Sequence, residues 1–166
     1  MSKAVVFTIS DSRSAGAAKD LSGPAVTEAL AAMGLDIVEQ RVIPDDREAI
    51  SVAVRECVDR VSLVVTTGGT GIARRDVTPE AVMPLMDRQL PGFGEIMRTG
   101  SYSKTPLSII SRGGAGIAGR TLIVMLPGSP NAVRDGLSLI GPAIRHVLKF
   151  LEDQPVDCRT ESKSDS

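Results

Sequence analysis

The chain has 166 residues, of which 42% are hydrophobic and 23% charged, and these values predict one globular domain with a full core. A net charge of -1 and an aromatic content of 2% argue against a nucleic-acid-binding module, which normally carries a basic stripe or base-stacking rings. No segment resembles a signal peptide and no apolar run could span a bilayer, so we expect a cytoplasmic protein that binds no membrane.

Apolar, β-branched runs alternate with segments of helical periodicity along the chain. Four runs are expected to form strands, at residues 3–10, 36–44, 62–67 and 121–128. Helices are expected at residues 22–33, at 45–61, from 78 onward with Thr78 as cap, as two short helices within 91–112, and at 130–151 with a break near Gly141 and Pro142. These elements make residues 1–153 a single domain and residues 154–166 a disordered tail.

This alternation of strands and helices predicts a three-layer α/β/α sandwich around a mostly parallel sheet. Ligands of such sheets usually bind outside the carboxyl ends of the strands. The loops that follow the four expected strands contain DSRS, PDD, GGTGIARRD and PGSPN, which hold most of the conspicuous glycine, serine and acidic residues. We therefore expect these four loops to meet at one rim.

The two cysteines, Cys57 and Cys158, form no CxxC pair and neither adjoins the single histidine, His146. A zinc site or a disulfide framework is therefore not expected. Cys57 lies on the apolar stripe of an expected helix, which favours a small core residue. His146 has no acidic or thiol partner nearby in the sequence and is a weak candidate for catalysis.

The loop GGTGIARRD carries the strongest local signal. Gly68, Gly69 and Gly71 can adopt positive φ and leave no side chain above the backbone, so successive N–H groups can turn inward as an anion-binding nest. The loop lacks the Lys-Ser/Thr ending of a Walker A loop and does not match GxGxxG. Glycines after a strand also commonly mark only a sharp turn, so the glycines alone leave both interpretations open.

Asp76 favours ligand binding at this loop. A carboxylate beside a phosphate-binding nest repels an anionic ligand unless it holds a cation, and Mg²⁺ is the natural candidate. Asp45, at the end of another expected strand, could supply a second carboxylate. Asp at a helix start is more often a cap, however, and Asp46 is the rival for that role.

Four separated motifs carry a family resemblance: TTGGTGIARRDVTPEA at residues 66–81, PGFGE at 91–95, LSIISR at 107–112 and LPGSPNAV at 126–133. Together they resemble the MogA/MoaB type of molybdenum-cofactor biosynthesis protein, the molybdopterin adenylyltransferases. The resemblance spans nearly the whole chain and leaves out only the tail. It implies a homotrimer and a separate molybdenum insertase as partner.

The activity that this resemblance implies is transfer of AMP from Mg-ATP to the phosphate of molybdopterin, with release of pyrophosphate. Asp76 and Asp45 are the implied catalytic and metal-binding residues, Mg²⁺ is the implied cofactor, and ATP and molybdopterin are the substrates. The implied substrate-binding and nucleotide-binding residues come from all four motifs: Thr67, Gly68, Gly69, Thr70, Gly71, Glu95, Ser111, Arg112, Pro127, Gly128, Ser129 and Pro130. Arg112 could pair with a phosphate through two parallel hydrogen bonds.

Ile72 stands where some adenylyltransferases of this family carry proline, which brings the chain closer to the MoaB-like branch. A molybdopterin-binding carrier or scaffold without catalytic activity is therefore the alternative function. A nucleotide-binding regulator that ignores the pterin is a more distant alternative.

Overall fold

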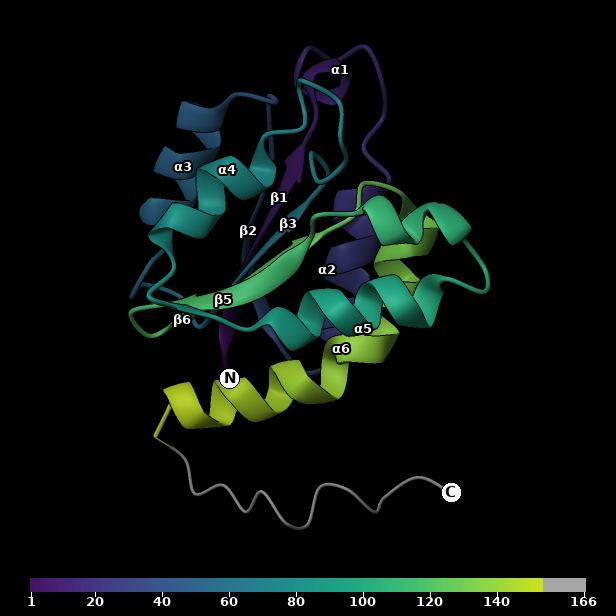
Figure 1. Ribbon diagram of the computed structural model, residues 1–166. Coiled ribbons are helices and arrows are strands. Elements are labelled where there is room, and N and C mark those ends of the chain that lie inside the picture. The colour runs from purple at the N-terminus through teal and green to yellow at the C-terminus, as the bar shows by residue number, and fades with distance from the viewer. Residues whose placement is uncertain (154–166) are drawn as a thin grey trace.

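The computed structural model describes residues 1–153 and arranges them around a six-stranded sheet with the strand order β2-β1-β3-β6-β5-β4 (Figure 1). Its four mutually parallel strands are the expected ones: β1 (Lys3–Ile9), β2 (Asp36–Ile43), β3 (Leu63–Thr67) and β6 (Thr121–Leu126). Every residue of β3 and β6 is buried, which explains their unbroken apolar sequences. The expected tail, residues 154–166, lies outside the described residues.

Two further strands, β4 (Arg88–Gln89) and β5 (Gly114–Ala118), are absent from the sequence-based prediction. β5 runs antiparallel to β6, and Gly119, with a φ of +55°, lies in the turn that joins them. The sequence GAGIAG at residues 114–119 has the GxGxxG spacing, but it forms this hairpin. Glycine is needed at position 116, because a Cβ there would collide with the side chain of Met86.

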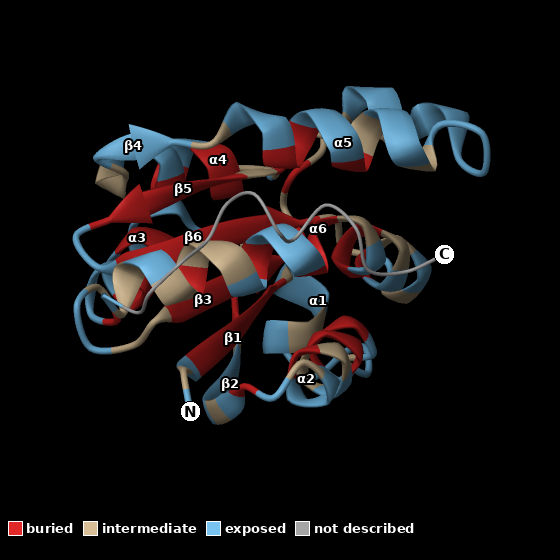
Figure 2. Ribbon diagram, turned by 90° about the horizontal axis from the view of Figure 1, so that it is seen from below, coloured by how far each residue is buried: buried red, intermediate tan, exposed pale blue. Residues whose placement is uncertain are grey.

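Helices cover both faces of the sheet (Figures 1 and 2), as the expected three-layer sandwich requires. One face packs against α2 (Ser22–Ala32), α5 (Pro91–Ser101) and α6 (Pro130–Leu151), and the other packs against α3 (Arg47–Arg55) and α4 (Thr78–Val82). Each face has its own apolar cluster, because successive strand residues point to opposite faces. The shorter helical segments are α1 (Asp11–Ser14), η1 (Met83–Leu85) and η2 (Pro106–Ile110).

Two expected helix boundaries are wrong. α3 ends at Arg55 instead of continuing to residue 61, because Asp59 has a φ of +62°, which no right-handed helix accommodates. α6, by contrast, continues through Gly141 and Pro142 without a break. Pro142 and Ser138, whose carbonyl loses a helical partner there, are both exposed, so water can bond that carbonyl while the buried face keeps the helix intact.

The parallel strands place the loops after β1, β2, β3 and β6 at one edge of the sheet, which confirms the expected rim. Hydrogen bonds join these loops directly: the N–H of Ser10 donates to the carbonyl of Ile43, and that of Gly68 to the carbonyl of Leu126. Cys57 lies in the core, as expected. Within residues 1–153, none of the helices has the length and hydropathy that a bilayer crossing requires.

Candidate functional site

The turn after β3 depends on two glycines with left-handed backbone conformation. Gly68 and Gly69 have φ values of +101° and +64°, a region that other residues rarely adopt. A Cβ on Gly68 would also collide with the carbonyl of Ile9, and one on Gly69 with the hydroxyl of Thr78. Thr78 does not cap α4 as expected; it stabilises the turn, since its hydroxyl donates to the carbonyl of Gly68 at 2.9 Å and its N–H to that of Gly69 at 3.1 Å.

The same turn exposes a row of backbone donors. The N–H groups of residues 69–72 donate to no acceptor within residues 1–153, whereas the flanking N–H groups of Gly68 and Ala73 do have acceptors. Consecutive amides without partners form a ready site for an anion such as a phosphate group. The turn therefore has the free amide donors that the expected nest requires.

Asp76 lies against this turn. Its Oδ2 accepts the N–H of Ala73 at 2.9 Å, and a Cβ on Gly71 would lie 2.7 Å from the same oxygen. Gly71 does not have the positive φ that we expected. A side chain at this position would displace the Asp76 carboxylate, which packs closely against the backbone of Gly71.

Asp45 reaches the turn from the end of β2. Its Oδ1 would lie 3.2 Å from a Cβ on Gly69, and its Oδ2 accepts the N–H of Asp11 at 2.9 Å, while the N–H of Asp45 donates to the Asp11 carboxylate at 2.9 Å. The helix cap is Asp46, whose Oδ1 accepts the N–H of Ala49 at 2.8 Å. Asp45 is therefore not the cap of α3 and faces the rim.

Burial raises the pKa of the Asp45 carboxyl above its usual value, and the charges of Asp11 and Asp76 raise it further, against the lowering effect of the Asp11 N–H. Asp45 and Asp76, from two separate loops, lie against neighbouring glycines of one turn, Gly69 and Gly71. Negative charge gathered in this way favours a bound cation.

The carboxylate cluster fits Mg²⁺ only in part. Residues 1–153 contain no group of three or more His, Cys, Asp or Glu side chains arranged to hold a metal ion. Asp45 and Asp76 alone could therefore supply no more than part of an octahedral shell. That incomplete set matches Mg²⁺ sites in which one or two carboxylates are joined by substrate phosphates and water.

Arg112 holds the glycine turn through side-chain hydrogen bonds. Its Nε donates to the carbonyl of Gly71 at 2.8 Å, its Nη2 to that of Asp76 at 2.7 Å, and its Nη1 to the carboxylate of Glu80. This hydrogen bond from Arg112 lowers the pKa of the Glu80 carboxyl. These bonds use three of the five N–H donors of the guanidinium, so Arg112 holds the turn, and its pairing with a phosphate through the other two stays a prediction.

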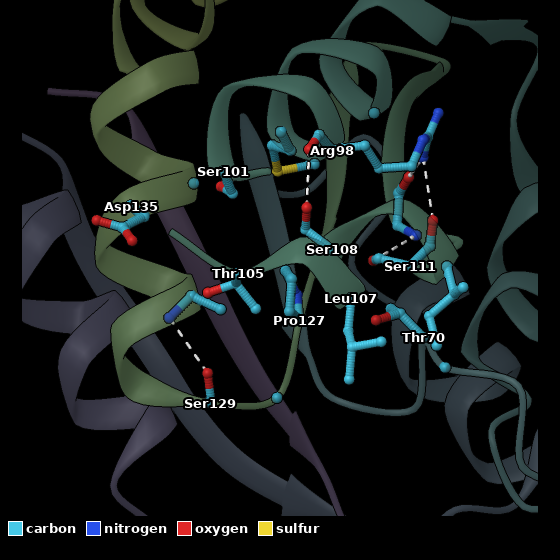
Figure 3. Close-up of a pocket in the computed structure, with 18 residues that line it drawn as sticks. Thr70, Arg98, Ser101, Thr105, Leu107, Ser108, Ser111, Pro127, Ser129 and Asp135 are labelled. Atoms are coloured by element: carbon cyan, nitrogen blue, oxygen red, sulfur yellow. Dashed lines mark hydrogen bonds between the residues drawn. The ribbon is translucent and has the colours of Figure 1, made fainter. Parts of the chain in front are cut away.

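A cavity of about 320 Å³ adjoins the turn, between α5, η2 and the start of α6 (Figure 3). Its walls combine apolar side chains with the hydroxyls of several serines and threonines, among them Thr70, Ser101, Thr105, Ser108, Ser111 and Ser129. Thr70 and Gly71 line the cavity and also belong to the row of free amides. The cavity and the anion-binding turn are therefore continuous.

Six of the expected binding residues line this cavity: Thr70, Gly71, Ser111, Pro127, Gly128 and Ser129. Glu95 does not, since it is exposed on α5 and lies beyond the first helical turn. Pro130 is the first residue of α6 and lies outside the lining. Thr67 is buried beneath the turn, and its hydroxyl donates to the carbonyl of Pro127 at 2.6 Å.

Arg98, which no sequence pattern singled out, is the one arginine among residues 1–153 that lines the cavity. Its Nη1 donates to the carbonyls of Ser111 and Gly113 at 3.2 and 3.0 Å, so it fixes the segment that carries Ser111 (Figure 3). Gly94, one helical turn earlier, leaves room for this guanidinium, because a Cβ there would lie 2.8 Å from Nη1. A glycine four residues before an arginine on one helix was the available signal.

Among residues 1–153, the site contains backbone donors and carboxylates but no paired nucleophile and base. His146, the single histidine, lies on α6 with its ring 5.0 Å from that of Phe150, away from the cavity lining. The arrangement suits chemistry that requires positioning and charge neutralisation, as transfer of a phosphate-containing group does.

Comparison with known families gives a match over most of the chain. The profile of the family described as "Probable molybdopterin binding domain" matches residues 5–146. A molybdopterin adenylyltransferase of Helicobacter pylori is 41% identical over 150 residues, which cover 88% of this chain and 85% of that protein. Its counterpart in Escherichia coli K12 is 42% identical over 147 residues, which cover 86% of this chain and 75% of that protein.

Solved structures agree with the sequence match. The molybdopterin biosynthesis enzyme MoaB from Thermus thermophilus superposes with a TM-score of 0.87 at 38% identity. That similarity covers 95% of this chain and all of the MoaB chain.

Proposed function

The chain belongs to the family of molybdopterin-binding domains, and from this premise we propose that it is a molybdopterin adenylyltransferase of molybdenum-cofactor biosynthesis. Its substrates are ATP and molybdopterin, and its products are adenylylated molybdopterin and pyrophosphate. The relatives that bear this enzyme name are similar over most of their own length, which supports carrying the activity over to this chain.

One observation carries the proposal. The turn with the free amides of residues 69–72 adjoins both the cavity and the carboxylates of Asp45 and Asp76, since Gly71 lines the cavity and packs against Asp76, and Gly69 packs against Asp45. A phosphate group at these amides can therefore face a pterin in the cavity on one side and a nucleotide on the other. A carrier needs the cavity alone, whereas the transfer of AMP needs both sides.

In the proposed reaction, a phosphate oxygen of molybdopterin attacks the α-phosphorus of ATP, the bond from that phosphorus to the bridging oxygen breaks, and pyrophosphate leaves with the electron pair. The amides of residues 69–72 orient the phosphates and stabilise the charge that develops on their oxygens. Arg112 and Thr78 keep those amides in place through the hydrogen bonds described above. No side chain has to form a covalent bond.

Asp45 and Asp76 are the proposed metal-binding and catalytic residues. They would hold Mg²⁺, which when bound neutralises phosphate charge and polarises the transferred group. The paired contacts between Asp45 and Asp11, and the position of Asp45 against the turn that Asp76 also contacts, support a cation at this place. Gly68, Gly69 and Thr70 shape the nucleotide side, while Ser111 and residues 127–129 shape the pterin side.

The test is pyrophosphate release by the purified full chain with ATP, Mg²⁺ and molybdopterin. We expect one pyrophosphate for each adenylylated molybdopterin and none when molybdopterin is left out. A folded preparation that binds molybdopterin but releases no pyrophosphate would make the protein a carrier. Binding of ATP with no response to molybdopterin would make it a nucleotide-binding regulator.

We also propose that the protein works in the cytoplasm as a homotrimer and passes its product to a molybdenum insertase. The family resemblance supports this assembly and this partner. Light scattering of the purified chain tests the trimer, and a mass equal to that of one chain would contradict it.

A further inference from the structure

The turn after β6 is held by an unusual set of hydrogen bonds. Three successive carbonyls each accept a hydrogen bond from a different residue. The carbonyl of Leu126 accepts the N–H of Gly68 at 3.0 Å. The carbonyl of Pro127 accepts the hydroxyl of Thr67 at 2.6 Å, and that of Gly128 accepts the hydroxyl of Ser22 at 2.5 Å. The donors come from β3, the loop after it and α2. The orientation of the two peptide groups after Pro127 and Gly128 is thus fixed by side-chain hydroxyls.

Neither hydroxyl can contact a ligand. Ser22 and Thr67 are both 0% exposed, and neither lines the cavity. Thr67 was expected to bind the substrate or the nucleotide, and its complete burial is at odds with direct contact. Any effect of these two residues on the reaction must act through the turn that they hold.

The fixed carbonyls determine where the neighbouring amides point. In a trans peptide, the C=O of one residue and the N–H of the next point in opposite directions, and residues 1–153 contain no cis peptide bond. The carbonyls of Pro127 and Gly128 point to β3 and α2, so the N–H groups of Gly128 and Ser129 point away from them. Gly128 and Ser129 line the cavity, and their N–H groups donate to no acceptor within residues 1–153.

Ser22 is itself held in place. The Asp20 carboxylate accepts the N–H groups of Ser22 and Gly23 through Oδ1, both at 3.1 Å, and the hydroxyl of Thr8 through Oδ2 at 2.8 Å. These bonds connect β1 and the start of α2 to the turn after β6. The Ser22 hydroxyl is therefore directed at Gly128 by fixed neighbours.

We propose that Ser22 and Thr67 are positioning residues, which aim the N–H groups of Gly128 and Ser129 into the cavity so that they hold the phosphate-bearing end of the pterin substrate. This inference rests on the proposed function. When either hydroxyl is lost, its carbonyl loses its partner, the peptide can rotate, and an amide donor turns away from the substrate.

The chain offers a matched control for Thr67. Thr121, at the other end of the same strand pair, is also 0% exposed, and its hydroxyl donates to the carbonyl of Val61 at 2.7 Å and accepts the N–H of Asp59 at 2.9 Å. Thr121→Val therefore removes at least as much hydrogen bonding as Thr67→Val, but far from the cavity. Thr67→Ser keeps the hydroxyl and serves as the conservative rescue.

The first measurement compares the kinetics of these variants with their melting temperatures. Thr67→Val and Ser22→Ala are each expected to raise the KM for molybdopterin about tenfold, which corresponds to one hydrogen bond, with a smaller change in kcat. Thr121→Val should lower the melting temperature to a similar extent and leave the KM for molybdopterin unchanged. Thr67→Ser should stay within about twofold of the wild type.

The second measurement follows the amide groups of Gly128 and Ser129 directly. In two-dimensional ¹⁵N–¹H NMR spectra, molybdopterin should shift the amide signals of Gly128 and Ser129 in the wild type and in Thr121→Val, but much less in Thr67→Val. Equal shifts and equal KM values in Thr67→Val and Thr121→Val would overturn the inference. If the wild type binds molybdopterin without turnover, the proposed function fails, while the shifts still decide the role of Thr67. A wild type that does not bind molybdopterin would overturn both.

Discussion

At the amino end of β3 and β6 the polar groups of the chain pair with one another, whereas at the carboxyl end of the same two strands a row of backbone amides donates to no acceptor within residues 1–153. At the amino end, the N–H of Asp59 donates to the hydroxyl of Thr121, which donates to Val61, while the Asp59 carboxylate accepts the N–H of Arg120 at 2.7 Å. At the carboxyl end, the amides of residues 69–72 lie beside Asp76.

Both ends belong to one rigid sheet and both use residues with left-handed backbone, Asp59 at one end and Gly68 and Gly69 at the other. The two ends differ in whether the backbone N–H groups of the strained turn find hydrogen-bond acceptors within the protein. A turn that satisfies them contributes stability, and one that leaves them pointing outward keeps them for a ligand. The unsatisfied donors thus place the site at the carboxyl end, and four experiments test whether the two ends differ in this way.

The largest effect is expected from Asp76→Asn, which keeps the size of the side chain but removes its charge from the carboxyl end. We expect turnover to fall about 100-fold or more with the fold intact, because the charge of Asp76 is needed to hold the cation that would neutralise the phosphates. Asp36→Asn, at the start of β2, removes an exposed carboxylate at the amino end and should leave turnover unchanged. Pyrophosphate release measures both variants, and comparable rates for them would remove Asp76 from the site.

The next largest effect is expected from Gly69→Ala. The new Cβ collides with the Thr78 hydroxyl at a φ of +64°, so we expect about tenfold weaker ATP binding and a loss of about 1–3 kcal/mol in unfolding free energy. Gly34→Ala is the control, because Gly34 has a φ of +84° with nothing within 4 Å of its would-be Cβ. Calorimetry and urea unfolding separate the two effects, and identical ATP affinity in both variants would mean that Gly69 serves only the backbone turn.

Asp59→Ala tests the opposite end. Asp59 has a left-handed backbone, and its carboxylate accepts the N–H of Arg120. Removing this acceptor should lower the free energy of unfolding by about 1 kcal/mol without changing turnover. Asp59→Asn retains an acceptor and tolerates the same conformation, so its loss should be smaller. A fall in pyrophosphate release for Asp59→Ala at full folding would show that the two ends are not independent.

The smallest effect concerns the pH dependence of stability. Burial and the charges of Asp11 and Asp76 raise the pKa of Asp45, so the folded state holds its proton to higher pH than the unfolded state. Stability is therefore lost as the pH rises from the usual Asp value through the raised one, and the loss is complete above it.

Asp45→Asn removes this titration. The difference in unfolding free energy between this variant and the wild type is taken at about pH 3 as the reference. By about pH 7 the difference should have moved in favour of the variant by a few tenths of a kcal/mol. The change is small because Asp45 is partly exposed. Turnover should nevertheless fall in this variant. Urea unfolding at both pH values measures the difference, and a difference of the opposite sign would contradict the assigned cause.

Much of the fold could be predicted because its signals are local. The unbroken apolar runs of β3 and β6 predict strands that are covered on both faces. The helical spacing of apolar residues predicts that α3 packs one side against the sheet, through Ile50, Ala53, Val54 and Cys57. β5 escaped prediction because GAGIA is rich in glycine, a poor strand former, and its pairing with β6 and β4 outweighs that preference. α6 continues past Pro142 because tertiary packing outweighs one missing donor.

Three features of the site could be predicted from the sequence: a turn at the glycines after β3, an acidic residue beside that turn, and the meeting of four strand-end loops. They are predictable because backbone freedom, charge and strand direction are properties of short segments. Only the tertiary structure decided that Asp46 caps α3 while Asp45 faces Asp76, that Arg112 holds the glycine turn, and that Ser22 reaches across 106 positions to Gly128. Those roles are hydrogen bonds between distant segments, and no local pattern encodes which donor will meet which carbonyl once the layers have packed.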